Sequence, residues 1–229
     1  MAHHPPPRWT SHDGLLVARF RHGPLWNFSY LVACAETGEA AVIDPAWDAS
    51  AILQAAAGQA LRITTVLLTH SHSDHANGVA ELVAASGARS FVHVLDQAGL
   101  QAHAPDATSF SGDEAFLLGQ QQVTAHHTPG HTAGSVTFQA GTMLFTGDTL
   151  AVASPGTPGP EPGSLELLWQ STQALAALGG QFVVHPGHDS GPEPSATLSV
   201  ERDRNPGLLA ATLDEFRAAV ERATGRSHA

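Results

Sequence analysis

The sequence predicts an α/β protein made of two halves, in each of which several short strands are followed by helices. Short runs of β-branched and aliphatic residues, separated by turns that contain glycine or proline, indicate the strands. Apolar residues at helical spacing indicate the helices, and 229 residues are enough for one substantial domain. We expect residues 1–12, which are polar and proline-rich, to be disordered, and residues 13–229 to form a single domain that includes a C-terminal helix.

The first half is predicted to open with antiparallel strands. Three short apolar runs, at residues 15–20, 28–33 and 40–43, are separated by Gly-Pro and Thr-Gly-Glu turn signals. The third run ends at Asp44, for which two interpretations remain open. Asp44 either forms the turn before the next proline or is a carboxylate that orients metal-binding histidines. A short helix is expected at 50–57.

A predicted buried strand at residues 63–68 leads directly into the most informative segment of the chain. This segment, Thr-His-Ser-His-Ser-Asp-His, begins at Thr69 and places three histidines and one carboxylate within six residues. A helix is expected at 76–86, because its apolar residues form one stripe and Gly87 supplies a stop signal. Histidines between a strand and a helix favour a metal site over the alternative, a cluster of surface histidines in a chain that has 15.

The spacing within this segment indicates two metal ions. Residues two apart on an extended backbone point the same way, so His70 and His72 can bind one ion together. Asp74 and His75 are adjacent and cannot project as that pair does, whereas a second ion beside the first would give them a partner. Imidazole and carboxylate ligands together suit zinc, iron or manganese. The expected cofactors are therefore two divalent metal ions, with zinc preferred and iron or manganese as alternatives.

The second half is predicted to contain further strands and two helices. The strands are expected at 90–94, 116–118, 122–127, 135–138 and 142–145, with one more beginning at 182. Residues 96–112 lack periodicity and are assigned to a loop with a short helical turn. Helices are expected at 164–178 and at 206–223, where Asn205 serves as the N-cap. The apolar stripe of the terminal helix comprises Leu209, Leu213, Phe216 and Val220.

Three turns of the second half each present one polar residue at the end of a strand. His131 and His188 each follow a Pro-Gly turn, and Asp148 follows an apolar strand, where an unpartnered buried carboxylate would be costly. His131 is the candidate third ligand of the first ion. His93 and His103, which no ligand spacing recruits, are expected to be structural or exposed. His185 lies within or just after its strand and is left out of the ligand set.

The segment from Thr69 to His75 resembles the T-H-x-H-x-D-H signature of the metallo-β-lactamase superfamily. The strand approach from Trp26 to Val32 is also similar to the N-x-Y-L-V strand of that family, and the match extends to about Asn205. The resemblance implies a four-layer αβ/βα sandwich of two mixed sheets, with the metals at one edge between the sheets. It implies His70, His72 and His131 as ligands of the first metal, Asp74, His75 and His188 as ligands of the second, and Asp148 as the bridge.

Within the superfamily, the chain is most similar to the glyoxalase II and persulfide dioxygenase branch. The similar segments are T-P-G-H-T-A-G-S at 128–135, F-T-G-D-T-L at 145–150, and E-x-x-x-N-P at 201–206. The resemblance implies a metal-dependent hydrolase in which a metal-bridging hydroxide attacks an acyl bond, with a small thioester of the hydroxyacylglutathione kind as the preferred substrate. Asp74 would act both as a ligand and as a general base.

Two departures from this branch leave the thiol partner open. The branch's Gly-Cys-Gly-Arg or Gly-Cys-Gly-Lys segment is replaced by a proline- and glycine-rich run at 154–163, so no cation in the run can meet a glutathione carboxylate. The C-terminal tail is also shorter than the helical extension that grips glutathione in glyoxalase II. The run itself is interpreted as either a lid over the substrate or a solvent loop.

Several other functions also remain open at this point. A mononuclear iron persulfide dioxygenase would use His70, His131 and Asp148 as a facial triad, and a lactonase would use the two-metal centre. A non-catalytic metal protein is disfavoured, because structural zinc sites are closed and commonly contain cysteine. Cys34 is the only cysteine, and we expect it to be buried.

The composition disfavours several kinds of partner. The formal net charge is −11 and no basic run occurs, so nucleic acid is an unexpected partner. No apolar run approaches the roughly 18 residues of a membrane span, and no segment of the signal-peptide kind begins the chain. We therefore expect a small-molecule substrate, no membrane partner and a cytoplasmic location. The composition does not determine the oligomeric state.

Overall fold

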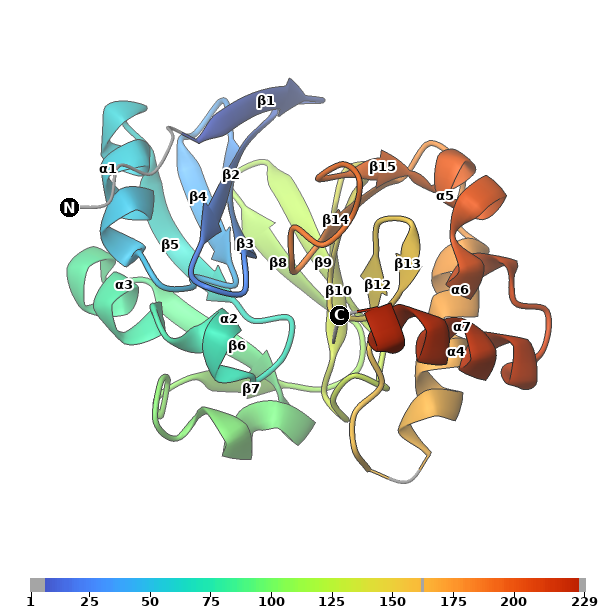
Figure 1. The fold of residues 1–229 in the computed structure, drawn as a ribbon. Coiled ribbons are helices and arrows are strands. Elements are labelled where there is room, and N and C mark those ends of the chain that lie inside the picture. Colours follow the sequence, from blue (N-terminus) through green and yellow to red (C-terminus); the bar gives the residue numbers. More distant parts are fainter. Residues whose placement is uncertain (1–6, 162, 227–229) are drawn as a thin grey trace.

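The computed structural model describes residues 7–161 and 163–226, in which two β-sheets pack face to face with helices on both outer sides (Figure 1). The expectation of disorder for residues 1–6 lies outside the described residues. Residues 8–12, which were also expected to be disordered, instead form a strand. The reason is that every one of them pairs with a residue of the next strand, from Arg8 opposite Arg19 to His12 opposite Leu15.

The first sheet has seven strands, in the order β1-β2-β3-β4-β5-β6-β7. They are β1 (Arg8–His12), β2 (Leu15–His22), β3 (Asn27–Cys34), β4 (Glu39–Ile43), β5 (Arg62–Leu67), β6 (Arg89–His93) and β7 (Thr108–Phe110). β1 to β4 pair antiparallel, as was predicted for β2, β3 and β4, and β4 to β7 pair parallel. Parallel neighbours need crossover connections, which α1 (Ala49–Gly58), α2 (Ser73–Ala76), α3 (Val79–Ser86) and the 3-10 helix η1 (Val94–Leu100) supply.

The second sheet has six strands, in the order β15-β14-β11-β10-β9-β8. They are β8 (Glu114–Leu118), β9 (Gln121–His127), β10 (Val136–Ala140), β11 (Met143–Gly147), β14 (Val183–Pro186) and β15 (Ala196–Thr197). Only β11 and β14 pair parallel, so this sheet is also mixed. The small hairpin of β12 (Leu150–Ala151) and β13 (Ser154–Pro155) follows β11. The outer helices are α4 (Ser164–Ala176), α5 (Leu198–Arg204), α6 (Pro206–Leu209) and α7 (Leu213–Arg226).

The core occupies the space between the sheets and the space between each sheet and its helices. Alternate residues of a strand point to opposite faces, so Val32 packs with Phe138 of the second sheet while Leu31 packs with Ile52 and Leu82 of α1 and α3. Every residue of β3 is buried, including Cys34, as expected for a strand covered on both faces. The expected four-layer sandwich of two mixed sheets is therefore confirmed.

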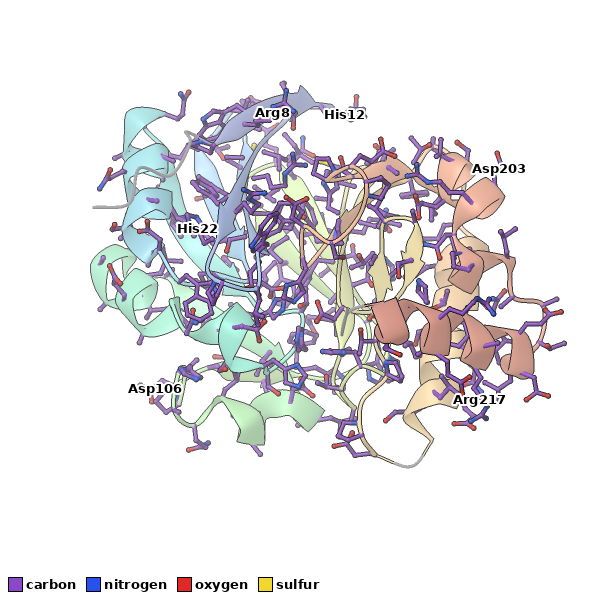
Figure 2. The ribbon with its side chains drawn as sticks, in the orientation of Figure 1. Arg8, His12, His22, Asp106, Asp203 and Arg217 are labelled. Atoms are coloured by element: carbon purple, nitrogen blue, oxygen red, sulfur yellow. The ribbon has the colours of Figure 1, made fainter. Side chains whose placement is uncertain are left out.

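The charged surface contrasts with this interior. Asp106, Asp203 and Arg217 are exposed side chains at the periphery of the molecule (Figure 2).

Among the described residues, no helix combines the length and the apolar character needed to cross a membrane.

The helix predicted over 76–86 begins earlier and is broken in two, α2 and α3. The break lies at Asn77 and Gly78, where Asn77 Oδ1 accepts a hydrogen bond from the backbone N–H of Trp47 at 2.6 Å. Gly78 N donates to Pro45 O at 2.9 Å, and a Cβ at this position would lie 2.6 Å from the same oxygen. The chain therefore bends against the loop after β4, which was not visible in the local pattern.

The terminal helix predicted over 206–223 is likewise two helices, α6 and α7. Asn205 caps α6 as predicted, because its Oδ1 accepts from Gly207 N at 2.9 Å. A capping box then starts α7, in which Thr212 Oγ1 accepts from Glu215 N and Glu215 Oε2 accepts from Thr212 N. Leu209 is 56% exposed and does not belong to the buried stripe, whereas Phe216 packs against α4.

Candidate metal centre

Seven polar side chains meet at one end of the sandwich, between the two sheets. They lie on α2 and on the turns that follow β5, β9, β11 and β14: His70, His72, Asp74, His75, His131, Asp148 and His188. His131 Nε2 lies 2.9 Å from His72 Nδ1, and His188 Nε2 lies 3.2 Å from His75 Nε2. The structure therefore brings together all the residues that the sequence nominated.

The donor atoms form two groups that share a neighbour. One group is His70, His72 and His131, the other is Asp74, His75 and His188, and the donor atoms of each group all lie within 4.8 Å of one another. Asp148 lies between the groups, with its Oδ2 3.4 Å from His131 Nε2 and 3.4 Å from His188 Nε2. Its Oδ1 lies 3.6 Å from His75 Nε2. This division matches the one that the sequence resemblance implied.

Local backbone geometry presents these donors at the strand ends. His72 has an extended backbone and immediately precedes α2. The change from extended to helical backbone directs Asp74 and His75 toward His188, in the second donor group. Gly187 precedes His188 and packs against the centre. A Cβ at Gly187 would lie 2.4 Å from Asp148 Oδ1 and 2.8 Å from His75 Cε1, so only glycine fits there without displacing the donors.

The donor set fits divalent metal ions. His70 Nε2 and Asp148 Oδ1 are buried and have no hydrogen-bond partner among the described residues. A buried polar atom without a partner costs about 1–3 kcal/mol, which a bound cation would offset. Burial and the neighbouring His75 also hold the pKa of His70 well below its usual value, so the imidazole stays neutral, as a ligand must be.

Asp44 holds the imidazole of His75 and the end of β5. Its Oδ2 lies 3.1 Å from His75 Nδ1 and accepts from Thr69 Oγ1 at 2.6 Å, while its Oδ1 accepts from Thr69 N at 2.8 Å. Asp44 also lies close enough to His70 and His75 to count as a third donor group, but these hydrogen bonds already engage its oxygens. Of the two interpretations left open for Asp44, the structure favours the carboxylate that orients a histidine.

Asp96 connects the two turns that carry the first donor group, and the sequence placed it only in a loop. The buried carboxylate accepts from Ser71 N and Thr132 Oγ1 through Oδ2, and from Gly134 N through Oδ1, each at 2.8 Å. Ser71 lies between His70 and His72, and Thr132 follows His131. These contacts join segments 25 to 38 residues apart, so no local pattern could have revealed them.

Asn27 and Thr157 support the remaining donors. Asn27 is fully buried, and its Nδ2 donates to Asp74 Oδ2 at 2.9 Å. Thr157 O accepts from His131 Nδ1 at 2.7 Å, and Gly159 N donates to Gly130 O at 2.8 Å. The described part of the run at 154–163 is therefore anchored to the His131 turn. Both interpretations of this run, lid and solvent loop, miss that role.

A cavity of about 1050 Å³ opens beside the donor groups. His72, Asp74, Asp148 and His188 line it, together with the start of the anchored run and the exposed end of α7. Two of its lining residues are arginines: Arg204 pairs with Glu193 and Glu201, whereas Arg222 has no ion pair within the described residues. The cavity therefore offers one cation to a substrate, from a helix rather than from the run at 154–163.

The E-x-x-x-N-P segment has a structural role beside this cavity. Asn205 Nδ2 donates to the carbonyls of Ala151 and Ser154 at 2.9 Å, and to the buried Glu201 carboxylate at 2.8 Å. Glu201 also accepts from Ala153 N at 2.7 Å. The segment therefore fixes the β12–β13 hairpin, which forms part of the cavity wall.

The three histidines that the sequence analysis set aside belong to none of the donor groups found among the described residues. His93 stacks on His127, with ring centroids 4.2 Å apart. His185 stacks on Phe145 and meets the edge of Tyr30. His103 lies in the turn that follows η1.

Two histidine-rich groups that share an aspartate, placed at the strand ends of a double-sheet sandwich beside a cavity, fit the class of metal-dependent hydrolases. The family model described as the metallo-beta-lactamase superfamily matches residues 23–188. This chain belongs to the metallo-beta-lactamase superfamily.

Relatives support the enzyme class. A protein named hydroxyacylglutathione hydrolase from Rhodospirillum rubrum is 38% identical over 200 residues, which cover 84% of this chain and 75% of that protein. A protein named probable polyketide biosynthesis zinc-dependent hydrolase PksB, from Bacillus subtilis, is 28% identical over 173 residues, which cover 75% of this chain and 77% of that protein. The expectation of a metal-dependent hydrolase is confirmed.

Solved structures share the fold. ETHE1 from Myxococcus xanthus has a TM-score of 0.80 and 26% identity, and the match covers 90% of each chain. TTHA1623, solved in a di-iron-bound form, has a TM-score of 0.66 and 32% identity, and the match covers 82% of this chain and 98% of that one.

Proposed function

We propose that this enzyme hydrolyses the thioester bond between a hydroxyacyl group and a small thiol, with hydroxyacylglutathione as the first candidate substrate. The observation that carries the proposal is the pair of donor groups that share Asp148 at the wall of a cavity. The relative from Rhodospirillum rubrum, named for that substrate, supports the choice of acyl bond.

In this proposal the seven side chains hold two divalent metal ions. His70, His72 and His131 hold the first, Asp74, His75 and His188 hold the second, and Asp148 contacts both. Zinc is the preferred metal, because imidazole and carboxylate donors suit it and one relative is named zinc-dependent; iron and manganese are the alternatives. When bound, such ions polarise an acyl carbonyl and lower the pKa of a water molecule.

Asp74 is the proposed general base. Asn27 Nδ2 holds Asp74 Oδ2 at 2.9 Å, and no hydrogen bond within the described part of the chain involves Asp74 Oδ1. Asp74 lines the cavity, so Oδ1 can accept a proton from the attacking water while Asn27 fixes the carboxylate.

The remaining cavity wall suits a thiol carrier that bears a carboxylate. Arg222 supplies a guanidinium without a carboxylate partner among the described residues, and a planar guanidinium binds carboxylate through two hydrogen bonds. A cavity of about 1050 Å³ also accommodates a molecule larger than a simple acyl thioester.

Metal analysis combined with a substrate panel tests this function. Protein purified without added metal would be analysed for zinc, iron and manganese, and assayed with hydroxyacylglutathione, a neutral thioester, a lactone and glutathione persulfide. We expect two metal ions per chain and hydrolysis of the glutathione thioester. One iron per chain, with oxygen uptake in the presence of the persulfide, would instead indicate the oxygenase alternative. Faster hydrolysis of the lactone would refute the proposal that a thioester is the substrate.

An Asp74→Asn variant separates catalysis from folding. Loss of a general base typically lowers the rate by about 10²–10⁴-fold, and the circular dichroism spectrum should stay unchanged. The matched control is Asp106→Asn, at an exposed position outside the centre. Full activity in Asp74→Asn would refute the assigned role.

The single-domain organisation of residues 13–229 and the cytoplasmic location stay predictions.

A further inference from the structure

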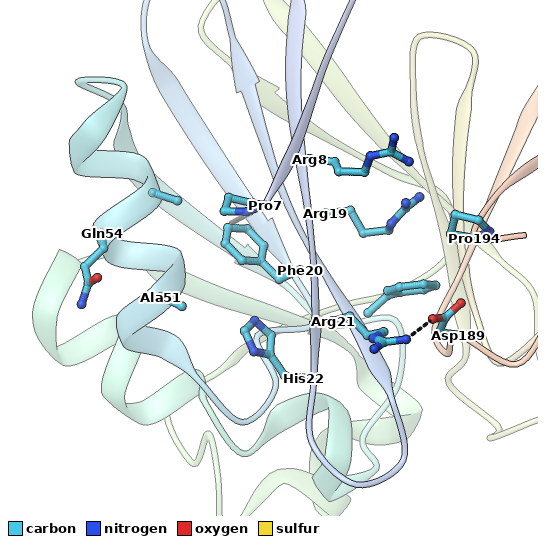
Figure 3. Close-up of a pocket in the computed structure, with 12 residues that line it drawn as sticks. Pro7, Arg8, Arg19, Phe20, Arg21, His22, Ala51, Gln54, Asp189 and Pro194 are labelled. Carbon is cyan, nitrogen blue, oxygen red and sulfur yellow. Dashed lines mark hydrogen bonds and ion pairs between the residues drawn. The ribbon is translucent and has the colours of Figure 1, made fainter. Parts of the chain in front are cut away.

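A second cavity, of about 770 Å³, shares no lining residue with the first. It lies beside β2, and α1, Phe28 and the segment after His188 complete its wall. Figure 3 shows Arg8, Arg19 and Arg21 one above another, with their guanidinium groups directed toward the segment that carries Asp189 and Pro194. This cavity plays no part in the proposed hydrolysis.

Strand geometry explains why the three arginines converge. Arg19 and Arg21 are two residues apart on β2, so their side chains project from the same face. Arg8 is the direct cross-strand partner of Arg19 in the β1–β2 pair. Like charges directly opposite each other destabilise a sheet, and this chain places three of its ten cationic residues here although its net charge is −11. A bound anion would remove that cost.

Aromatic rings hold two of the arginines in place. The guanidinium of Arg19 lies over Phe28 at 5.0 Å from the ring centroid, and that of Arg21 lies over Trp26 at 4.5 Å. Stacking of this kind orients a guanidinium while its N–H groups stay available in the ring plane.

The ion pairs leave part of this charge unmatched. Arg21 Nη1 pairs with Asp189 Oδ2 at 2.8 Å, and Asp189 is the one acid among the residues that line the cavity. The side chains of Arg8 and Arg19 form neither an ion pair nor a hydrogen bond with any described residue, although the two backbones pair in the β1–β2 ladder. Burial lowers the pKa of Arg19, which indicates that its charge is partly withdrawn from water.

We propose that this cavity binds a small organic oxyanion, whose phosphate or carboxylate group lies between Arg8 and Arg19. Guanidinium groups recognise both kinds of oxyanion through paired, charge-assisted hydrogen bonds. The rest of the ligand would extend toward α1, where Ala51 and the Gln54 amide supply apolar and polar surface. The volume exceeds that of a single inorganic ion and falls within the usual range of ligand pockets.

Arginine side-chain NMR tests the site directly. The chain has ten arginines and no lysine, so the Nε–Hε region of a nitrogen–proton spectrum reports every arginine side chain without interference from lysine. The metal-loaded protein would be titrated with inorganic phosphate and, separately, with succinate at constant ionic strength. We expect saturable shifts of the Arg8 and Arg19 signals with at least one probe, and the effective probe identifies the preferred oxyanion.

Variants separate this site from anion binding at the metals. Arg19→Gln should weaken the binding that these signals report at least tenfold, and Arg8→Gln, at an exposed position, should do the same without disturbing the interior. The matched control is Arg89→Gln, because Arg89 also lies over an aromatic ring, Phe91 at 5.3 Å, but does not line the cavity. The proposal would be overturned if the Arg8 and Arg19 signals shifted linearly with probe concentration and no more than the Arg89 signal. Saturable binding that is unchanged in both Arg8→Gln and Arg19→Gln would also overturn it.

Discussion

The carboxylate of Asp44 lies 3.1 Å from Nδ1 of His75, and both side chains are buried. This contact fixes the imidazole so that its other nitrogen, Nε2, faces Asp148 and His188. A histidine held in this way has one orientation and one tautomer available for a metal ion.

Replacing Asp44 by asparagine should therefore weaken metal binding. Losing such a partner typically costs about 10–100-fold in affinity, and the asparagine amide cannot accept from both Thr69 and His75 as the carboxylate does. Competition titration with a chromogenic zinc chelator measures the effect, with Asp106→Asn as the control. Equal zinc affinity in Asp44→Asn and the parent protein would contradict the role assigned to Asp44.

Asp96→Asn should lower the free energy of unfolding. The three hydrogen bonds to Ser71, Thr132 and Gly134 are made to a charged group, and bonds of this kind contribute about 1.5–3 kcal/mol each. We expect a loss of about 3 kcal/mol in urea denaturation of the metal-loaded protein. Asp203→Asn, at an exposed position, is the control (Figure 2). Because Asp96 connects the two turns that carry His70, His72 and His131, the variant should also bind zinc more weakly. A loss of stability with unchanged zinc affinity would show that Asp96 does not position these donors.

Arg222→Gln should affect charged and neutral substrates differently. If Arg222 meets a substrate carboxylate, the variant should raise KM for hydroxyacylglutathione about tenfold, since each tenfold corresponds to about 1.4 kcal/mol. KM for a neutral thioester should not change. Arg217→Gln is a control on the same helix, because Arg217 faces Glu166 and does not line the cavity. Equal KM increases for both thioesters would argue against carboxylate recognition.

His185 should make the stability of the fold depend on pH. Burial and, to a lesser degree, the nearby Arg19 lower the pKa of His185 to about 3, and its Nδ1 is buried without a hydrogen-bond partner among the described residues. The unfolded chain binds this proton more tightly. Burial of His185 therefore costs no stability above its ordinary pKa of about 6.5. As the pH falls from there toward 3, the free energy of unfolding decreases by about 1.4 kcal/mol per pH unit.

The variant His185→Phe should remove this contribution to acid sensitivity. The difference in unfolding free energy between the variant and the parent protein should grow between pH 6.5 and pH 4.5, as measured by urea denaturation. The matched control is His12→Phe, which changes an exposed histidine. A pH-independent difference for His185→Phe would show that this imidazole does not titrate as proposed.

The fold and the donor residues could be predicted because their signals are local. A strand that ends in Thr-His-Ser-His-Ser-Asp-His, or in Pro-Gly-His, carries both the strand signal and the candidate ligand within a few residues. The break between α6 and α7 is also locally encoded, by the capping box of Thr212 and Glu215. The prediction of one helix was wrong here because the apolar stripe continues across the break. Asp96 and Arg222 could not be found in this way, because each reaches the centre or its cavity only through contacts between distant segments.

The order of the donors along the chain has a consequence for biosynthesis. The first four, from His70 to His75, leave the ribosome well before His131, Asp148 and His188 are translated. Until the last of these turns has been translated, the early histidines lack the candidate ligands that the second sheet contributes. In the proposed centre, neither metal ion can therefore acquire its full set of side-chain ligands until the C-terminal half has been translated.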